Sequence, residues 1–409
     1  MNLKRISKTA ISYLLSAAFV VSMLAGSGCN NPKIIEDYPE PVSITETVDE
    51  GEPADGESET ETKPAQKEEE DLDEALRANY DSIKETGEFI YNPIAINPVF
   101  KMELKNNPRL VRIAKKMLQA IYDCSPELVL DGDEACTEAE FNLARELAAL
   151  SSPFVEIAEF DTEDNETYTI TYFPTYTYDE FGEAQITDGV STDEAKKKIE
   201  AYTDLVTEII NTNITDKDDE MQRAAKIYKY LIENYELDYS EFESEDVVEE
   251  DEDGYPKGQV ISYNTAENSY IDVFAEDTMY YWYFLRFYEY LMVQLNVDCM
   301  LVGCMGEYHD QSFSKMGKVF DGSDRGWVWL IVKNGDDAYH CDMIMDKLAL
   351  DSQRESFEDY KSDMLYFGMS DEKRNKSYQM YWTRIFESVN PVNSTSLPQC
   401  EKDYVLLLK

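Results

Sequence analysis

The segment AYHCDMIM, residues 338–345, places a histidine, a cysteine and an aspartate side by side in an otherwise apolar strand pattern. These residue types are the base, the nucleophile and the orienting carboxylate of many covalent catalysts. Successive residues of a strand point to opposite faces, so Cys341 points away from the face that His340 and Asp342 share. Cys341 therefore cannot attack on that face, and we expect His340 to be a structural histidine. Asp342 still needs a partner, because an unpaired buried carboxylate is costly.

The strand that carries Asp342 is the second strand of a predicted hairpin. Apolar and aromatic residues fill WVWLIV at 327–332, and NGDD at 334–337 has the composition of a tight turn. A helix is predicted near 278–295, and we expect Thr278 to cap its start. A helix followed by an antiparallel hairpin is thus the unit that positions Asp342.

The order of the motifs in this unit resembles the bacterial transglutaminase-like superfamily. LNVDC (295–299) is similar to the end of the family's central helix, Trp329 to the tryptophan of its H-A-W-N strand, YHCD (339–342) to its second strand, and YFGMSD (366–371) to its terminal motif. The resemblance covers residues 195–375. It implies a transglutaminase/papain-like core, in which a small antiparallel sheet packs on helices, and a Cys–His–Asp triad in a cleft.

Two of the three triad positions carry other residues in this chain. Asp342 falls on the aspartate position, but Trp327 stands at the histidine position and Tyr281 at the cysteine position. A tyrosine phenol is protonated at neutral pH and does not replace a thiolate. The resemblance therefore implies a pseudoenzyme, with no catalytic residue, cofactor or metal. Asp342 would be the remnant of the triad, bonded to the Trp327 N–H, the Tyr281 O–H or a backbone donor; alternatively, it only caps or bonds a loop.

A shift of the register would not restore the triad. No cysteine lies between Cys136 and Cys299, so no helix start in that interval can present a thiol. No histidine lies between His309 and His340, so the strand start cannot present an imidazole. An active protein-glutamine transamidase or cysteine-type peptidase would need a non-standard nucleophile, and it remains the alternative from the enzyme class.

Aromatic side chains crowd the degenerate positions: Tyr280, Tyr281, Trp282, Tyr283, Phe284, Trp327 and Trp329. Such rings stack on sugars and extended peptides. We therefore expect Tyr281, Trp282, Trp327 and Trp329 to bind a peptide or a cell-wall or extracellular polymer. The alternative is that the rings simply fill the volume of a former cleft.

Residues 1–29 have the pattern of a bacterial export signal, with basic residues, an apolar run and small residues before Cys29. Cys29 resembles the lipid-modified cysteine of a lipoprotein, although Gly26 stands where the lipobox prefers leucine. Residues 30–72 are acidic and contain one aromatic residue, which predicts a disordered tether. We expect an exported protein on the extracytoplasmic face, held to the membrane through Cys29 alone.

The chain has 409 residues and a formal net charge of −47, which argues against nucleic acid as a partner. Helical periodicity and a hairpin around 161–165 predict a helical and hairpin region over 73–190, followed by the degenerate transglutaminase-like domain over 191–409. The fold class is therefore expected to be α+β. A third function class stays open, a structural scaffold lipoprotein that interacts through its helices at 73–150.

Overall fold

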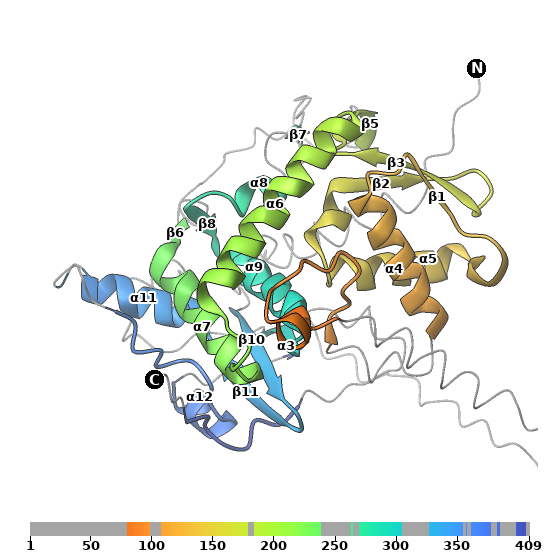
Figure 1. Cartoon of the computed structure of the whole chain (residues 1–409). Helices are drawn as coiled ribbons and strands as arrows, with labels where there is room; N and C mark the ends of the chain where they lie inside the picture. The colour runs from red at the N-terminus through yellow and green to blue at the C-terminus, as the bar shows by residue number, and fades with distance from the viewer. Residues whose placement is uncertain are drawn as a thin grey trace, which may run out of the picture.

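The computed structural model describes residues 80–98, 108–178, 184–238, 263–264, 270–304, 327–354, 357, 361–377, 383–384 and 398–405. Over these residues the fold is α+β, as predicted, with helices packed around small sheets (Figure 1). The predicted export signal with Cys29, the tether at 30–72 and His309 lie outside the described residues. No helix in the described part is long and apolar enough to cross a bilayer.

Three helices build much of the N-terminal part. Short α3 (Ser82–Thr86) is followed by α4 (Pro108–Tyr122) and α5 (Glu138–Ala149), which pack against each other through their apolar faces. Thr137 and Glu140 form a capping box at the start of α5, where each residue's side chain accepts the other's backbone N–H. This box satisfies two N–H groups that the first turn leaves without helical partners.

A three-stranded antiparallel sheet of order β1-β3-β2 lies beside these helices. Its strands are β1 (Glu127–Val129), β2 (Ala158–Asp161) and β3 (Thr167–Tyr172). β2 and β3 form the hairpin predicted around 161–165, and Ala158 lies opposite Tyr172. That prediction is confirmed.

The alternating run after this hairpin does not continue as one strand. Phe173 has a φ of 46°, and Pro174 follows it, so the chain turns out of the sheet there. The next residues form β4 (Thr175–Tyr178) in a second sheet, between β5 (Ala184–Asp188) and β7 (Tyr263–Asn264). The apolar residues alternate with period two both before and after Phe173 and Pro174, so the alternation does not reveal that the chain changes from one sheet to another.

Helices form the centre of the molecule. α6 (Thr192–Asn213) and α7 (Glu220–Asn234) pack together, and α7 packs on α9 (Tyr281–Gln294), with short α8 (Tyr270–Val273) near α6. All residues of α9 are buried except Trp282 and Tyr283, which are partly exposed. α9 is therefore a core helix, and only its first turn reaches the surface.

The predicted start of α9 is wrong by three residues. Residues Thr278–Tyr280 form β8, which pairs in parallel with β6 (Glu236–Asp238), and Met279 lies opposite Leu237. The helix begins at Tyr281 with Tyr280 as its N-cap residue, so Thr278 is not the cap. The strand pairing comes from a distant segment, which the local helix pattern does not contain.

A four-stranded antiparallel sheet of order β11-β10-β9-β12 carries the predicted hairpin. Its strands are β9 (Cys299–Cys304), β10 (Trp327–Asn334), β11 (Asp337–Cys341) and β12 (Thr383–Arg384). Asn334 pairs with Asp337 across a two-residue turn, in which Gly335 adopts a φ of 62°. This geometry confirms the hairpin predicted from NGDD.

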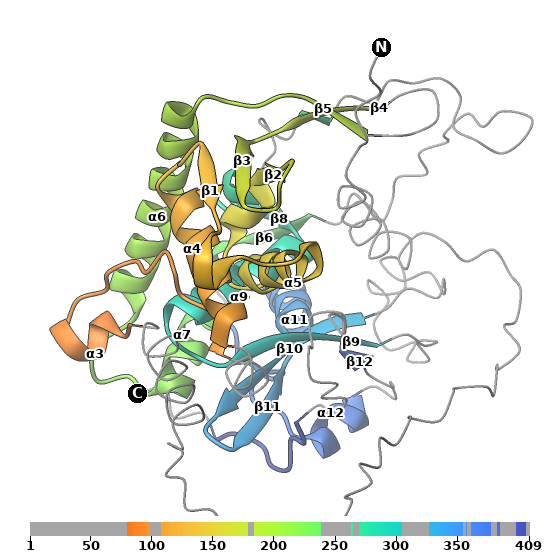
Figure 2. The same cartoon turned by 90° about the vertical axis from the view of Figure 1, so that its right-hand side faces the viewer.

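Helices cover both faces of this sheet. Figure 2 shows α9 and α11 (Met343–Arg354) on one side of the strands and α12 (Asp371–Ser377) on the other. Residues 329–332 of β10 are accordingly 0% exposed on both faces. At the outer edge of β11, the backbones of His340 and Met369 exchange a pair of antiparallel hydrogen bonds.

Candidate functional site

The three degenerate positions lie where α9 and β10 begin and where β11 ends. Tyr281 is the first residue of α9, Trp327 is the first of β10, and Asp342 directly follows β11. β10 and β11 are antiparallel with Leu330 opposite Cys341, so Trp327 and Asp342 lie at the same end of the hairpin.

The start of α9 returns to this same end. A short turn at 295–298 joins α9 to β9, and the two elements pack together. At about 1.5 Å per helical residue and about 3.3 Å per strand residue, both elements are roughly 20 Å long. The last residue of β9, Cys304, pairs with Trp327. The backbone thus brings Tyr281, Trp327 and Asp342 to one end of the sheet.

Asp342 caps a helix at this end. Its side chain is buried with 1% of the residue exposed, and its Oδ1 accepts the Met345 N–H, at 3.1 Å, in the first turn of α11. Its own N–H donates to the Tyr366 carbonyl at 2.9 Å. A backbone donor was one of the three partners expected for Asp342, and the capping role is the alternative that the sequence left open.

A second buried aspartate, not singled out from the sequence, lies one helical turn further on. Asp346 is 2% exposed, and its Oδ2 accepts the Tyr228 O–H at 2.5 Å and the Tyr366 N–H at 3.1 Å. Burial raises the pKa of the Asp346 carboxyl to about 7, and the nearby Asp342 charge adds to this rise. The spacing of four residues between Asp342 and Asp346 was the signal that could have indicated a buried carboxylate pair. Carboxylates on an exposed face of a helix have the same spacing, so the signal is not specific.

His340 is a buried histidine with both ring nitrogens engaged, as the sequence predicted. The Trp329 Nε1–H donates to His340 Nδ1 at 3.0 Å, and His340 Nε2 lies 2.8 Å from Asp371 Oδ1. Burial lowers the pKa of the imidazole to about 4, although Asp371 opposes this shift. His340 is therefore neutral at physiological pH.

Trp329, one of the four predicted binding residues, lies in the core. It is 0% exposed, and the guanidinium carbon of Arg374 sits 3.7 Å from the centre of its ring. Stacking on Arg374 and the bond to His340 occupy this indole. Trp329 thus has a packing role in this structure.

The start of α9 presents the partly exposed aromatic rings. Tyr280, Trp282 and Tyr283 are partly buried against the core, whereas Tyr281 is 7% exposed. The centre of the Tyr280 ring lies 4.3 Å from the centre of the Tyr281 ring and 6.2 Å from that of the Tyr283 ring, and both pairs are edge to face. We call Tyr280, Trp282 and Tyr283 the aromatic shelf. Trp327 belongs to the described backbone of β10, but its side chain lies outside the described atoms.

Nucleophilic chemistry at a cysteine needs a thiolate, and each cysteine whose side chain the structure describes has a raised thiol pKa. Burial is the main cause for all five, which are Cys124, Cys136, Cys299, Cys341 and Cys400. Protonated thiols are weak nucleophiles. These five thiols are therefore weak nucleophiles, whereas the side chain of Cys304, the last residue of β9, lies outside the described atoms.

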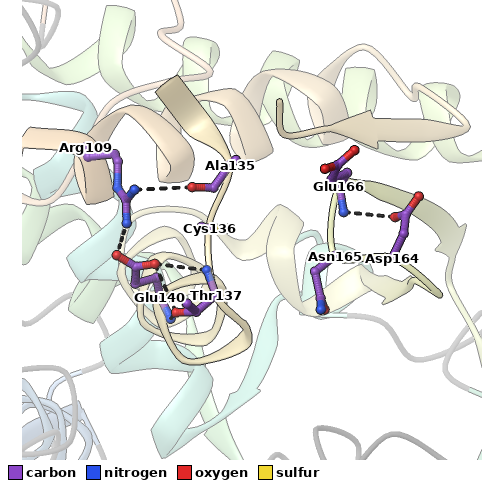
Figure 3. A pocket seen from close by; sticks show the side chains of 8 residues that line it. All are labelled: Arg109, Ala135, Cys136, Thr137, Glu140, Asp164, Asn165 and Glu166. Carbon is purple, nitrogen blue, oxygen red and sulfur yellow. Dashed lines mark hydrogen bonds and ion pairs between the residues drawn. The ribbon is translucent and has the colours of Figure 1, made fainter. Parts of the chain in front are cut away.

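A polar hollow of about 560 Å³ opens near the start of α5 (Figure 3). Its Arg109 is paired with Glu140 and donates to the Ala135 carbonyl at 3.2 Å. Asp164 accepts two backbone N–H groups of its own turn, and Cys136 contributes a protonated thiol. The polar groups named here thus have partners within their own half of the hollow.

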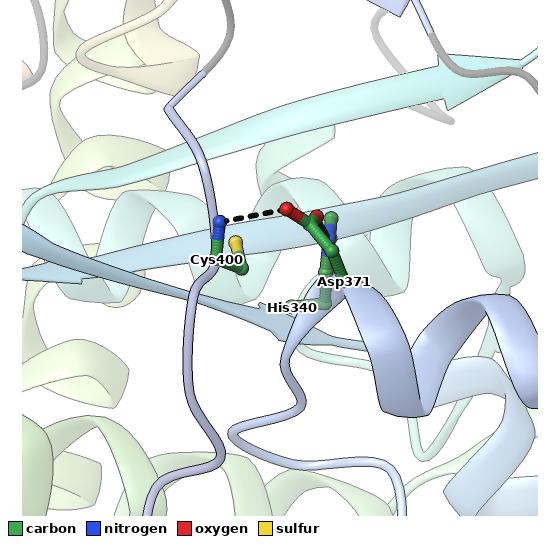
Figure 4. A group of neighbouring side chains, drawn as sticks. All are labelled: His340, Asp371 and Cys400. Carbon is green, nitrogen blue, oxygen red and sulfur yellow. Dashed lines mark hydrogen bonds and ion pairs between the residues drawn. The ribbon is translucent and has the colours of Figure 1, made fainter.

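Three potential metal ligands meet beside β11 (Figure 4). Donor atoms of His340, Asp371 and Cys400 all lie within 4.8 Å of one another. They come from β11, from the start of α12 and from the C-terminal segment at 398–405.

Comparison with known proteins adds no further constraint: no protein-family model matches this chain, and neither does any curated protein.

Proposed function

We propose that this chain is an exported lipoprotein whose region 191–409 is a catalytically inactive transglutaminase-like domain. The order of helix α9 followed by the hairpin of β10 and β11 supports this proposal, because the resemblance implies a helix followed by these two strands. β9 is an additional strand between them. The convergence of Tyr281, Trp327 and Asp342 at one end of the sheet supports it further.

The lack of activity follows from the chemistry of these positions. A tyrosine stands at the helix start, a tryptophan starts the strand, and Asp342 caps α11 through its carboxylate. The described thiols are protonated, so an active transamidase or peptidase has no nucleophile among them.

The domain binds a peptide or a cell-wall or extracellular polymer through the aromatic shelf. The observation that carries this proposal is the partial exposure of three aromatic rings, two in the first turn of α9 and one on its N-cap residue Tyr280. A helix start filled only for packing would bury these rings as it buries Tyr281. Partly exposed aromatic faces suit pyranose rings and extended peptides.

Retention on insoluble polymers tests the binding. The full chain should sediment with peptidoglycan or with an extracellular matrix polymer, and Trp282→Ala should reduce its retention about tenfold, as for a residue at the centre of a contact. Phe357→Ala is the matched control, because this ring is 65% exposed and lies outside the shelf. If no polymer or peptide library retains the wild-type chain, the binding proposal fails.

Membrane anchoring through Cys29 is tested separately. Cys29→Ser should move the protein from the membrane fraction to the soluble exported fraction and abolish incorporation of a labelled fatty acid. A Cys29→Ser protein that stays in the membrane fraction would contradict a lipid anchor.

A further inference from the structure

The segment 398–405 lies across the outside of β11 and is held there by backbone pairing. The Asp371 N–H donates to the Cys400 carbonyl at 2.7 Å, and the Cys400 N–H donates to Asp371 Oδ2 at 3.1 Å. The Tyr404 N–H donates to the Gly368 carbonyl at 2.8 Å. Between these two positions, Asp403 Oδ1 accepts the Ser370 N–H at 2.8 Å. Hydrogen bonds at residues 400, 403 and 404 therefore fix this segment.

At Tyr404 the side chain fits closely against neighbouring rings and against the backbone of Gly368. The Tyr404 ring packs edge to face on Tyr339 at 5.5 Å and on Phe367 at 6.4 Å. Gly368 has a φ of 71°, and a Cβ at this position would lie 2.7 Å from the Tyr404 Cβ. The glycine thus allows both the left-handed turn and the approach of Tyr404.

A divalent metal is the first ligand that the His340–Asp371–Cys400 group suggests, and the hydrogen bonds argue against it. An indole N–H can only donate, so the bond from Trp329 requires an unprotonated His340 Nδ1. The imidazole is neutral, so its proton is on Nε2, where it donates to Asp371. A metal on Nε2 would need that proton removed, and metal-bound histidines normally donate from the other nitrogen.

The remaining charges around this group agree with a hydrogen-bonded role. Arg374 from α12 places a positive charge close enough to oppose protonation of His340, and it would also oppose a cation. Burial raises the pKa of the Cys400 thiol to about 12, so it is not a ready metal ligand. Asp371 faces the imidazole as the negative group, and it uses its second oxygen for the Cys400 N–H.

We propose that residues 398–405 form a latch that opens and closes over the edge of β11 while the sheet stays folded. Asp371 closes the latch, because its two oxygens join the segment to His340 and, through His340, to Trp329. Opening removes one of the two partners of Asp371 and uncovers the outer side of His340.

Local opening is favoured by the small area that holds the segment. Cys400 is 1% exposed and Tyr404 is partly buried, whereas the residues between them and Val405 are exposed. The Lys402–Asp337 ion pair at 2.8 Å joins two exposed side chains and contributes little. Segments with few buried contacts open at low free-energy cost compared with the core strands.

Hydrogen exchange of the full chain tests the latch. Asp371→Asn keeps the size of the side chain, but it replaces one of the two acceptor oxygens with an NH2 donor, so one of the two donors loses its acceptor. The amides of Cys400 and Tyr404 should then exchange about tenfold faster or more, while the amides of β9 and β10 keep their protection. Unchanged exchange at Cys400 and Tyr404 in Asp371→Asn would overturn the proposal.

Tyr404 offers an independent pair of variants, in case Asp371→Asn disturbs the fold. Tyr404→Ala should open the latch, because it removes the ring contacts with Tyr339 and Phe367, and Tyr404→Phe should keep it closed. If both variants exchange alike at Cys400, the ring does not hold the latch and the proposal fails.

Cys400→Ser separates the latch from a metal site. The hydrogen bonds of the latch to Asp371 use the backbone of Cys400, and serine is close to cysteine in size, so this variant should keep most of the slow exchange of the segment. Added Zn²⁺ should leave the His340 imidazole signals of the wild type unchanged. A Zn²⁺-dependent shift of these signals that Cys400→Ser abolishes would show a metal site in place of the hydrogen-bonded latch.

Discussion

Trp329 donates its indole N–H to His340 Nδ1 at 3.0 Å, and this single bond fixes the tautomer of the histidine. The proton must then sit on Nε2, which faces Asp371 at 2.8 Å. A base needs an unprotonated nitrogen that its substrate can reach, and His340 has none, because one nitrogen is occupied by Trp329 and the other is protonated. The bond thus explains how a histidine can lie two residues from Asp342 without forming a catalytic pair.

The first prediction concerns the titration of His340. Its pKa in the folded protein, about 4, is below the value of 6.5 for a free imidazole. The contribution of this group to stability is therefore complete above pH 6.5 and is lost as the pH falls toward 4. The loss should reach about 3 kcal/mol at pH 4, because each pH unit in this window is worth up to about 1.4 kcal/mol.

Side-chain NMR can measure this pKa directly, because the chain contains 2 histidines. The His340 imidazole should stay in the neutral Nε2–H form at pH 5. In urea unfolding, His340→Gln should lose the pH dependence between 6.5 and 4 that the wild type has. A His340 midpoint near 6.5 would contradict the role given to burial and Arg374.

The second prediction concerns Asp342, which acts as a helix cap. Asp342→Asn keeps an oxygen that can accept the Met345 N–H, so it should cost little stability. Asp342→Ala leaves this buried N–H without its acceptor and should lower the free energy of unfolding by about 1–3 kcal/mol. Urea unfolding of the two variants compares them. Equal losses in Asn and Ala would show that Asp342 acts through its charge instead of through the cap.

Local features of the fold could be predicted from the sequence, because neighbouring residues determine them. The capping box of Thr137 and Glu140 and the turn at Gly335 are examples, since each depends on a few consecutive residues. A structural role for His340 was also expected at the level of the sequence. Its partners were not, because Asp371 lies 31 residues further along the chain.

The parts that could not be predicted depend on contacts between distant segments. β8 replaces the expected first turn of α9 because it pairs with β6, about forty residues earlier in the chain. Trp329 was expected to bind ligand, yet Arg374 covers its ring, and no pattern within β10 indicates this cover. The sequence shows that a residue is aromatic, and its periodicity indicates the face on which the residue lies. The exposure of the residue is decided by the elements that pack on that face.

The third prediction concerns Asp346. The pKa of this carboxyl is raised from 3.8 to about 7, mainly by burial. A raised pKa in the folded state means that the contribution of Asp346 to stability is complete at low pH and is lost as the pH rises through 7. The contribution of Asp346 to the free energy of unfolding should therefore decrease by about 2 kcal/mol between pH 5 and pH 8, which appears as a difference between the wild type and a variant that lacks the carboxyl.

Asp346→Asn should remove this dependence, since a carboxamide does not ionise and can still accept the Tyr228 O–H. Urea unfolding of both proteins at pH 5 and pH 8 measures the difference. Tyr228→Phe is a useful control, because it removes the hydrogen bond and leaves the carboxyl buried. If the wild type and Asp346→Asn change in parallel from pH 5 to pH 8, Asp346 does not titrate in this range.

The last prediction concerns the buried ion pair that joins α9 to the N-terminal region. Arg286 pairs with Glu289 and donates to the Ala149 carbonyl at 2.8 Å, and both charged residues are 2% exposed. Glu289 also accepts the amide of Asn97 at 3.3 Å. The pair thus ties the middle of α9 to the end of α5 and to residues near position 97.

Breaking one partner of this pair should cost more than removing both. Arg286→Met leaves the Glu289 carboxylate buried without its cation and should lower the free energy of unfolding by about 3–5 kcal/mol. Arg286→Met combined with Glu289→Leu removes the uncompensated charge and should recover part of this loss. Urea unfolding of the two single variants and the double variant gives the coupling free energy. Losses that simply add in the double variant would show that the two charges do not stabilise each other.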